Sequence, residues 1–188
     1  RIVYELRGIS CLDLDKVLPK KNVMCSRSFG NPVNSKAIIK DFITEYAIRA
    51  TEKVRQQNSR AQGIYIFLQT NRFRKEKQYS SGIMFGLNSP SCDTSIIIKL
   101  ALRAIDQIYQ SGYSYHKAGI MMLDLIPSEI HQQDLFQNTN YSLSDQRMGV
   151  IDFLNNKYGS GTITHGKIRQ KDKSRWKSKS FYLSPRYT

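Results

Sequence analysis

Two stretches of the chain place apolar residues at the spacing of a helix buried along one face. From 39 to 54 and from 97 to 108, apolar residues recur every three or four positions with polar residues between them. Residues that can cap these helices are Asn34 or Ser35 before the first, and Asp93, Thr94 or Ser95 before the second. Each pattern therefore predicts an amphipathic helix, and Gly112 marks the end of the second.

Four other segments have the composition of strands. Residues 64–68 are β-branched or aromatic and predict a central strand, and residues 81–87 predict its antiparallel hairpin partner. Residues 22–29 predict a first strand that ends at Gly30-Asn31-Pro32, and residues 115–126 predict a last one. The order predicts an α+β fold of the βαββαβ, split-βαβ or ferredoxin-like kind, with a four-stranded sheet and two helices on one face.

The segments on either side of this unit have a different character. Residues 1–20 have the pattern of a helix end and a linker, and residues 129–141 are a polar linker. A short helix is predicted from Ser142 or Ser144 to Gly159. From 167 to 186, eight Lys and Arg residues alternate with Trp176, Phe181 and Tyr182. We therefore divide the chain into 1–20, 21–128, 129–141 and a basic, helical or irregular extension over 142–188.

The net charge of the chain says more about its partner than its overall composition does. The chain has 29 Lys and Arg against 15 Asp and Glu, a net charge of +14. This excess predicts a polyanionic partner such as nucleic acid. The absence of a signal-peptide pattern and of a long apolar run, with three widely spaced cysteines, predicts a cytoplasmic protein with no membrane association. A chain that starts at Arg1 is expected to be part of a longer protein.

Patterns for catalysis or metal binding are weak. The three histidines, His116, His131 and His165, are too scattered for a metal site. Asp13-Leu14-Asp15 lacks a third carboxylate, and we interpret it as solvated charge. We therefore expect no catalytic residue, no metal site and no cofactor in this chain.

Several ordered motifs resemble the little-finger domain of Y-family DNA polymerases of the UmuC type, which copy damaged DNA. They are Ser26-Arg27-Ser28-Phe29-Gly30, Thr70-Asn71 with the basic loop after it, and Tyr115-x-Lys117-Ala118-Gly119-x-Met121-x-x-Asp124. Residues 7–12 are similar to the end of the thumb in that family, and residues 183–188 to its C-terminal extension. The resemblance covers nearly the whole chain.

The resemblance implies a noncatalytic domain that grips the phosphates of primer–template DNA. The residues it places at DNA are Ser26, Arg27, Ser28, Phe29, Arg72, Arg74, Lys75, His116 and Lys117. Such contacts position a protein on DNA without reading its sequence. The palm carboxylates that hold two metal ions in this family do not occur here. The parent polymerase is expected to use Mg²⁺, and its function would be SOS mutagenesis and DNA repair.

A short peptide in the linker resembles the motif by which bacterial proteins bind the sliding clamp, the β subunit of DNA polymerase III. Gln132, Asp134, Leu135 and Phe136 match it, whereas Gln133 replaces the usual aliphatic residue. The resemblance also makes the UmuD′ dimer and the RecA filament candidate partners, without residues assigned to either.

Two other classes of function remain open. An RNA-recognition module has the same order of elements along the chain, but residues 81–86 lack the aromatic signature of its third strand. A protein-interaction domain with incidental basicity is the other. Binding that weakens steeply with salt would separate nucleic-acid binding from the latter.

Overall fold

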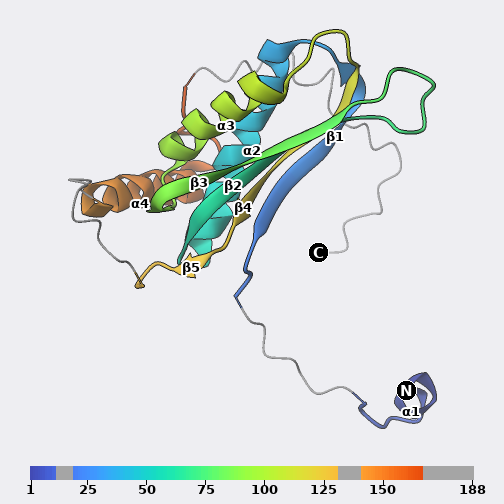
Figure 1. Ribbon diagram of the computed structural model, residues 1–188. Coiled ribbons are helices and arrows are strands. Elements are labelled where there is room, and N and C mark those ends of the chain that lie inside the picture. The colour runs from blue at the N-terminus through green and yellow to red at the C-terminus, as the bar shows by residue number, and fades with distance from the viewer. Residues whose placement is uncertain (12–18, 131–140, 167–188) are drawn as a thin grey trace.

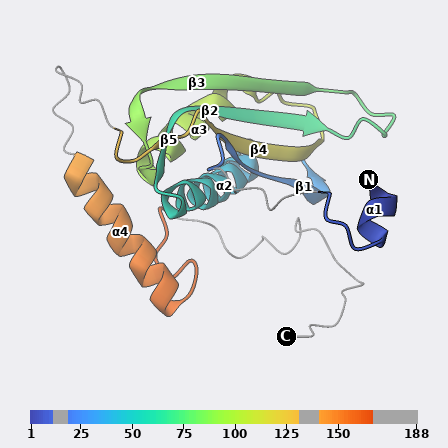
Figure 2. The same ribbon diagram turned by 90° about the horizontal axis from the view of Figure 1, so that it is seen from below.

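The protein is built around an antiparallel sheet. The computed structural model describes residues 1–11, 19–130 and 141–166. The strands are β1 (Val23–Val33), β2 (Ser59–Thr70), β3 (Ser80–Ser91) and β4 (Tyr115–Leu123), in the order β1-β4-β2-β3, and the short β5 (Ile126–Pro127) pairs with the start of β2. Helices α2 (Lys36–Gln56) and α3 (Thr94–Ile108) cover one face (Figures 1 and 2).

This arrangement confirms the predicted α+β, βαββαβ fold. β1 and β2 are joined through α2 and have β4 between them, while β3 and β4 are joined through α3 and have β2 between them. Both connections are therefore split βαβ units. The strand predicted to be central, β2, pairs with β3 on one side and with β4 on the other.

The core lies between the sheet and the two helices. Every apolar position predicted to face inward on α2 is buried, including Ile39, Ile43 and Val54. The sheet contributes alternate residues, because successive side chains of a strand point to opposite faces. These are Ile64, Ile66 and Leu68 from β2 and Ala118, Ile120 and Met122 from β4, all fully buried.

The strands differ from the prediction at their ends. β1 continues through Gly30-Asn31-Pro32 to Val33, with an irregularity of register between Ser28 and Val33. A proline is tolerated here because β1 is an edge strand. The predicted last strand is divided into β4 and β5 at Asp124, which has a positive φ of 49°.

Two helices lie outside the βαββαβ unit. α4 (Tyr141–Tyr158) lies beside the ends of α2 and α3 and begins one residue before Ser142, the earlier of its two predicted starts (Figure 2). It ends at Gly159, whose φ of 107° favours glycine. α1 (Ile2–Leu6) has no buried residue. Among the described residues, no helix has the length and apolarity needed to cross a membrane.

Candidate nucleic-acid interface

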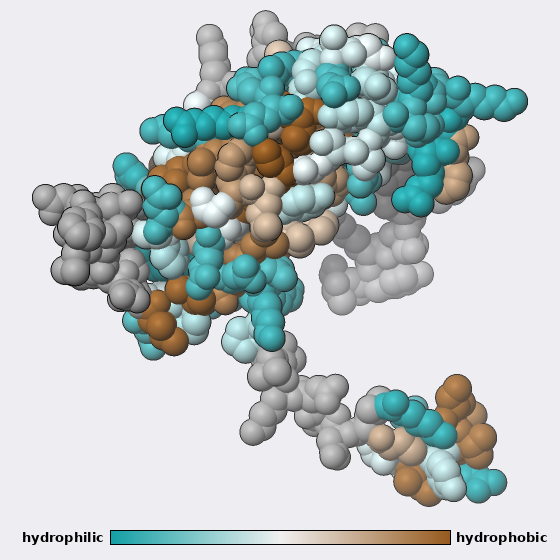
Figure 3. Space-filling model, in the orientation of Figure 1, coloured by the Kyte–Doolittle hydropathy of each residue, from teal (hydrophilic) through white to brown (hydrophobic). Residues whose placement is uncertain are grey.

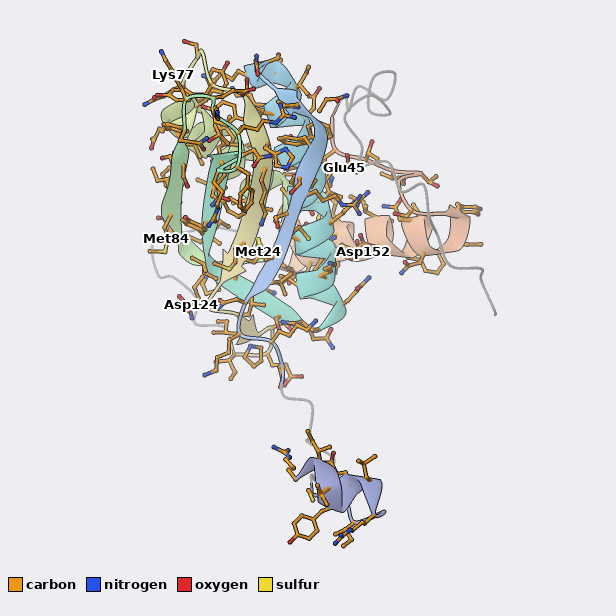
Figure 4. All side chains as sticks on the ribbon, turned by 90° about the vertical axis from the view of Figure 1, so that its right-hand side faces the viewer. Met24, Glu45, Lys77, Met84, Asp124 and Asp152 are labelled. Carbon is orange, nitrogen blue, oxygen red and sulfur yellow. The ribbon has the colours of Figure 1, made fainter. Side chains whose placement is uncertain are left out.

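The face of the sheet opposite α2 and α3, here called the open face, carries three of the six predicted DNA-binding residues that lie on strands, namely Ser26, Ser28 and Lys117. No helix of the described ranges covers it, and Figure 4 looks onto it with Met24 and Met84 toward the viewer. Its side chains follow from the register: when Ile64, Ile66 and Leu68 point into the core, their neighbours along β2 point outward.

A line of polar side chains crosses the open face at one end. Ser28 of β1 pairs with Lys117 of β4, Lys117 with Gln69 of β2, and Gln69 with Ser80 of β3. We call these four residues the polar row. Because neighbouring strands lie about 4.8 Å apart, the row is roughly 14 Å long. It presents one ammonium group, two hydroxyls and one amide, which all can donate to phosphate oxygens.

Two aromatic rings lie flat on the open face beside the polar row. The rings of Tyr65 and Phe67 are stacked with their centroids 6.0 Å apart. Phe67 lies across Gly119, where an added Cβ would be 2.6 Å from the ring, and Tyr65 lies across Gly82 in the same way. Only glycine leaves room for these rings. The resemblance motif therefore includes Gly119 for a steric reason.

The ring of Phe67 also positions Lys117. The Lys117 ammonium lies 5.8 Å from the centroid of that ring, within the range of a cation–π interaction. Lys117 is half-buried, and Phe67 is only 6% exposed although its ring lies on the open face. The cation is thus held on the open face and does not extend freely into solvent.

Further along, the open face becomes apolar. Met24, Met121, Tyr65 and Met84 form one row across the four strands. Met24 is 49% and Met84 66% exposed (Figure 4). The face therefore changes from cationic and polar at the β2–β3 loop to apolar at the other end.

The predicted cluster Ser26 to Phe29 is divided between the two faces of the sheet. Ser26 and Ser28 lie on the open face, next to Gly119 and Lys117. The Phe29 side chain is 2% exposed and packs on Phe42 of α2, with ring centroids 4.9 Å apart. The expectation that Phe29 contacts DNA therefore needs correction, because its ring belongs to the core.

Arg27 is exposed but lies on the helix side of β1. It pairs with Ala118, whose side chain points into the core. Burial raises the pKa of Tyr46 on α2 to about 12, with Glu45 adding to the shift, and the charges of Arg27 and Arg49 oppose it. This interaction places the Arg27 guanidinium near α2. It is separated from Ser26 and Ser28 by the edge of the sheet.

The remaining predicted residues fall in three places. Arg72, Arg74 and Lys75 are exposed on the loop between β2 and β3, at the same end of the sheet as the polar row. Figure 3 shows hydrophilic side chains projecting at this end. His116 is half-buried in β4, and its Nδ1 has no hydrogen-bond partner in the described part of the chain. The clamp-motif residues 132–136 lie outside the described residues.

Two cysteines of the described residues have raised pKa values. Burial raises the pKa of the Cys25 thiol despite the opposing charges of Lys53, Arg49 and Arg27, and burial also raises the pKa of Cys92. Both thiols are therefore protonated at neutral pH. All three cysteines are free. Within the ranges that the structure describes, no group of His, Cys, Asp or Glu is arranged to hold a metal ion.

Comparison with known proteins decides the family. The model of the impB/mucB/samB family C-terminal domain matches residues 20–135, and that of a domain of unknown function (DUF4113) matches residues 146–188. The chain belongs to the impB/mucB/samB family. This membership confirms the resemblance to UmuC-type proteins of the Y family of DNA polymerases.

Relatives in this family match the whole chain. Protein UmuC of Salmonella typhimurium is 36% identical over all of this chain and 45% of its own length, and protein SamB of the same species is 35% identical over all of this chain and 44% of its own. The chain thus spans less than half the length of these relatives. A solved structure, the insertion ternary complex of Dbh DNA polymerase, is similar over 56% of this chain and 29% of its own, with 14% identity and a TM-score of 0.43.

Several features of the interface were missed from the sequence of this impB/mucB/samB family member. Gln69 and Ser80 were not singled out, because their place in the polar row depends on register. Tyr65 and Phe67 were assigned only to a central strand, although the alternation within Ile64-Tyr65-Ile66-Phe67-Leu68 implies that two rings face away from the core. Phe73, in the basic loop, is 90% exposed and was also not identified.

Proposed function

We propose that this region grips the phosphates of primer–template DNA as the noncatalytic little-finger domain of a UmuC-type lesion-bypass polymerase. The observation that carries the proposal is the polar row with Lys117, on an uncovered sheet face beside the basic β2–β3 loop. The net charge of +14 supports an anionic partner. Family membership supports DNA over other polyanions.

The grip is expected to be independent of sequence. Lysine, serine and glutamine side chains can pair with phosphate oxygens, and such contacts set position along a duplex. A polymerase that copies damaged bases needs a domain that slides and does not read base edges. The parent protein would supply Mg²⁺-dependent nucleotidyl transfer from its own palm. Its setting would be SOS mutagenesis in the bacterial cytoplasm.

A salt titration tests this function. Binding of the 188-residue chain to primer–template duplexes of several sequences should weaken with salt, with log K falling by about 0.9 per phosphate neutralised. Lys117→Ala should weaken binding to all sequences equally and reduce the salt slope by about 1. Lys99→Ala removes the same charge from α3, on the helix-covered side, and serves as the matched control.

Three results would overturn the proposal. They are a flat salt response, an equal loss for Lys117→Ala and Lys99→Ala, or a sequence-dependent loss. A single-stranded RNA competitor that displaces DNA at equal concentration would favour the RNA-recognition class instead. Arg27→Ala is expected to weaken binding less than Lys117→Ala, because Arg27 lies on the helix side of β1.

The same proposal includes tethering to the sliding clamp through Gln132, Asp134, Leu135 and Phe136. Leu135→Ala combined with Phe136→Ala should abolish binding to the β subunit while leaving DNA affinity nearly unchanged. Buried apolar anchors of this kind are worth on the order of 2 kcal/mol or more each. Asn138→Ala combined with Thr139→Ala changes the same linker outside the motif. Unchanged clamp affinity in the first variant would refute tethering.

The basic extension 142–188 is proposed to contact further members of the same assembly. The UmuD′ dimer and the RecA filament are the candidates, without residues assigned to either. A pull-down of the chain against clamp, UmuD′ and RecA, each with and without DNA, tests the three partners together. Capture of none of them would restrict the function to DNA binding.

A further inference from the structure

Phe73 is the most exposed large apolar side chain in the described part of the chain. It is 90% exposed and lies in the loop between Thr70 at the end of β2 and Ser80 at the start of β3. Lys77, in the same loop, marks its position in Figure 4. A single exposed apolar residue needs no explanation by itself. The hydrogen bonds and charges of the loop around Phe73, however, indicate a function for this exposed ring.

Hydrogen bonds within the loop hold it in a defined shape. The Asn71 side-chain oxygen accepts from the Phe73 amide at 3.0 Å. The Gln78 side-chain amide donates to the carbonyls of Asn71, Arg74 and Glu76, at 3.1, 2.7 and 3.2 Å. At the base, the Thr70 amide donates to the Tyr79 carbonyl at 2.9 Å. Less ordering is therefore needed when the loop binds a partner.

The loop surrounds the aromatic ring with positive charge. Arg72, Arg74, Lys75 and Lys77 are all exposed, and Glu76 is the only acidic residue among them. Glu76 lies 3.6 Å from Arg74, and both side chains are more than half exposed. The loop therefore keeps an excess of cations on both sides of Phe73. The loop also adjoins the polar row. Gln69 is the last residue but one of β2, before the loop, and Ser80 is the first residue of β3, after it.

An exposed planar ring between cations matches the chemistry of single-stranded nucleic acid. A base offers a π-face for stacking, and the adjoining phosphates pair with Lys and Arg. In a duplex, each base is already stacked on both sides, so a ring can enter only after unstacking, which costs a few kcal/mol. An unpaired base carries no such penalty. The pattern thus favours unpaired bases over duplex.

We propose that Phe73 stacks on an unpaired nucleobase while the cations of its loop hold the adjoining phosphates. The loop then binds the single-stranded part of a primer–template, and the polar row binds the duplex part. This inference rests on the proposed DNA-binding function and deepens it. It assigns to one residue the preference between single strand and duplex.

Three probes of matched charge test the inference with the 188-residue chain: a single-stranded oligonucleotide, an abasic oligonucleotide of the same length, and a blunt duplex. Phe73→Ala should weaken single-strand binding roughly 5- to 150-fold, the range for loss of one base–aromatic stack. Binding to the abasic strand and to the duplex should be unchanged. Phe73→Tyr should retain single-strand affinity, whereas Phe73→Leu, which is apolar but not planar, should not.

The outcomes separate this inference from the function it rests on. If the unaltered chain binds DNA with steep salt dependence and Phe73→Ala loses nothing on the single strand, stacking is refuted and the phosphate grip remains. If the unaltered chain binds no probe, both proposals fail. Equal losses on the abasic and normal strands would also refute stacking. Vesicles containing phosphatidylserine form a further arm, and a Phe73→Ala loss confined to them would assign the loop to membranes.

Discussion

The helices of this protein are attached to it in two contrasting ways. α2 and α3 pack on the sheet through apolar side chains, with Ile43, Ile97 and Leu68 fully buried between the layers. α4 instead pairs charged residues with the domain, among them Asp145, Arg147 and Asp152. The first attachment depends on surface removed from water, and the second depends on the geometry of charged pairs.

Three carboxylates form the charged part of the contact between α4 and the domain. Asp152 accepts from Arg55 Nε and Nη2 at 2.6 and 2.7 Å, and Asp145 pairs with the buried Arg60. Asp93, at the start of α3, accepts from Ser144 and Arg147 of α4 at 2.5 and 2.6 Å.

Only part of the apolar surface of α4 is used in this contact. Met148 is fully buried, whereas Leu143, Val150 and Phe153 are each more than half exposed. The difference between the two attachments shows that α4 is held more by ion pairs and hydrogen bonds of defined geometry than by the burial of apolar surface. Its attachment should therefore respond to charge removal and to acid, while the sheet and its helices should not.

The largest effect on stability is expected from a substitution in the apolar contact between the sheet and its helices. Leu68→Ala removes a fully buried side chain between the sheet and the helices. It should lower the free energy of unfolding by about 2–5 kcal/mol, because it leaves a cavity. Urea denaturation measures the change. Met84→Ala, on the open face of the same sheet, should have a much smaller effect, and equal losses would contradict the assignment of the two faces.

An intermediate effect is expected from the charged attachment. Arg55→Ala leaves Asp152 without its two-point partner, and it also removes hydrogen bonds to Cys92 and Thr94. The loss of Arg55 should lower the free energy that holds α4 on the domain by roughly 1–3 kcal/mol. Hydrogen exchange should show faster exchange in α4 and little change in β2. Asp106→Ala, which removes exposed pairs with Lys36 and Lys40, should change neither.

A double-mutant cycle of Arg55→Ala with Asp152→Ala sharpens this test. A coupling energy clearly above zero would show that the pair acts together. Exchange that rises equally in α4 and β2 would contradict the separate attachment of α4.

The smallest expected effect is a dependence on acid. Burial by itself would raise the pKa of Asp93, but hydrogen bonds from Ser144, the Ser95 amide and Arg147 together hold this pKa below its ordinary value of 3.8. A carboxyl group with a lowered pKa in the folded state stabilises that state above its unfolded pKa. This contribution is lost as the pH falls through the folded value.

Hydrogen exchange in α4 as a function of pH measures this effect. Once intrinsic exchange rates are corrected for, α4 should become less protected below about pH 4, near the unfolded pKa of an Asp side chain. Asp93→Asn should remove part of that dependence and weaken α4 at neutral pH. An unchanged profile in Asp93→Asn would rule out Asp93 as its source.

The sequence predicted the elements of the fold better than their limits. The prediction of the apolar faces of α2 and α3 was correct, because a helix with one buried side places apolar residues every three or four positions along the sequence. The end of β1 was wrong because Gly30-Asn31-Pro32 is usual for a turn yet is tolerated on an edge strand. The order of the strands required contacts between residues far apart in the chain.

The candidate site was predicted in part. Ser26, Ser28 and Lys117 lie on one open face, and Arg72, Arg74 and Lys75 lie in the loop beside it. Whether these residues touch DNA stays a prediction. The grouping of Arg27 and Phe29 with Ser26 and Ser28 neglected the alternation of a strand, which turns neighbours to opposite faces.

By itself, the sequence determined the helices, the strands, the family and the excess of positive charge, because each of these is written in local patterns or in composition. The tertiary structure alone decided which side chains share a surface. Ser28, Lys117, Gln69 and Ser80 come from four strands and meet in one row only through register. The pairing of Arg55 with Asp152 joins positions 97 residues apart, and only the docking of α4 brings them together.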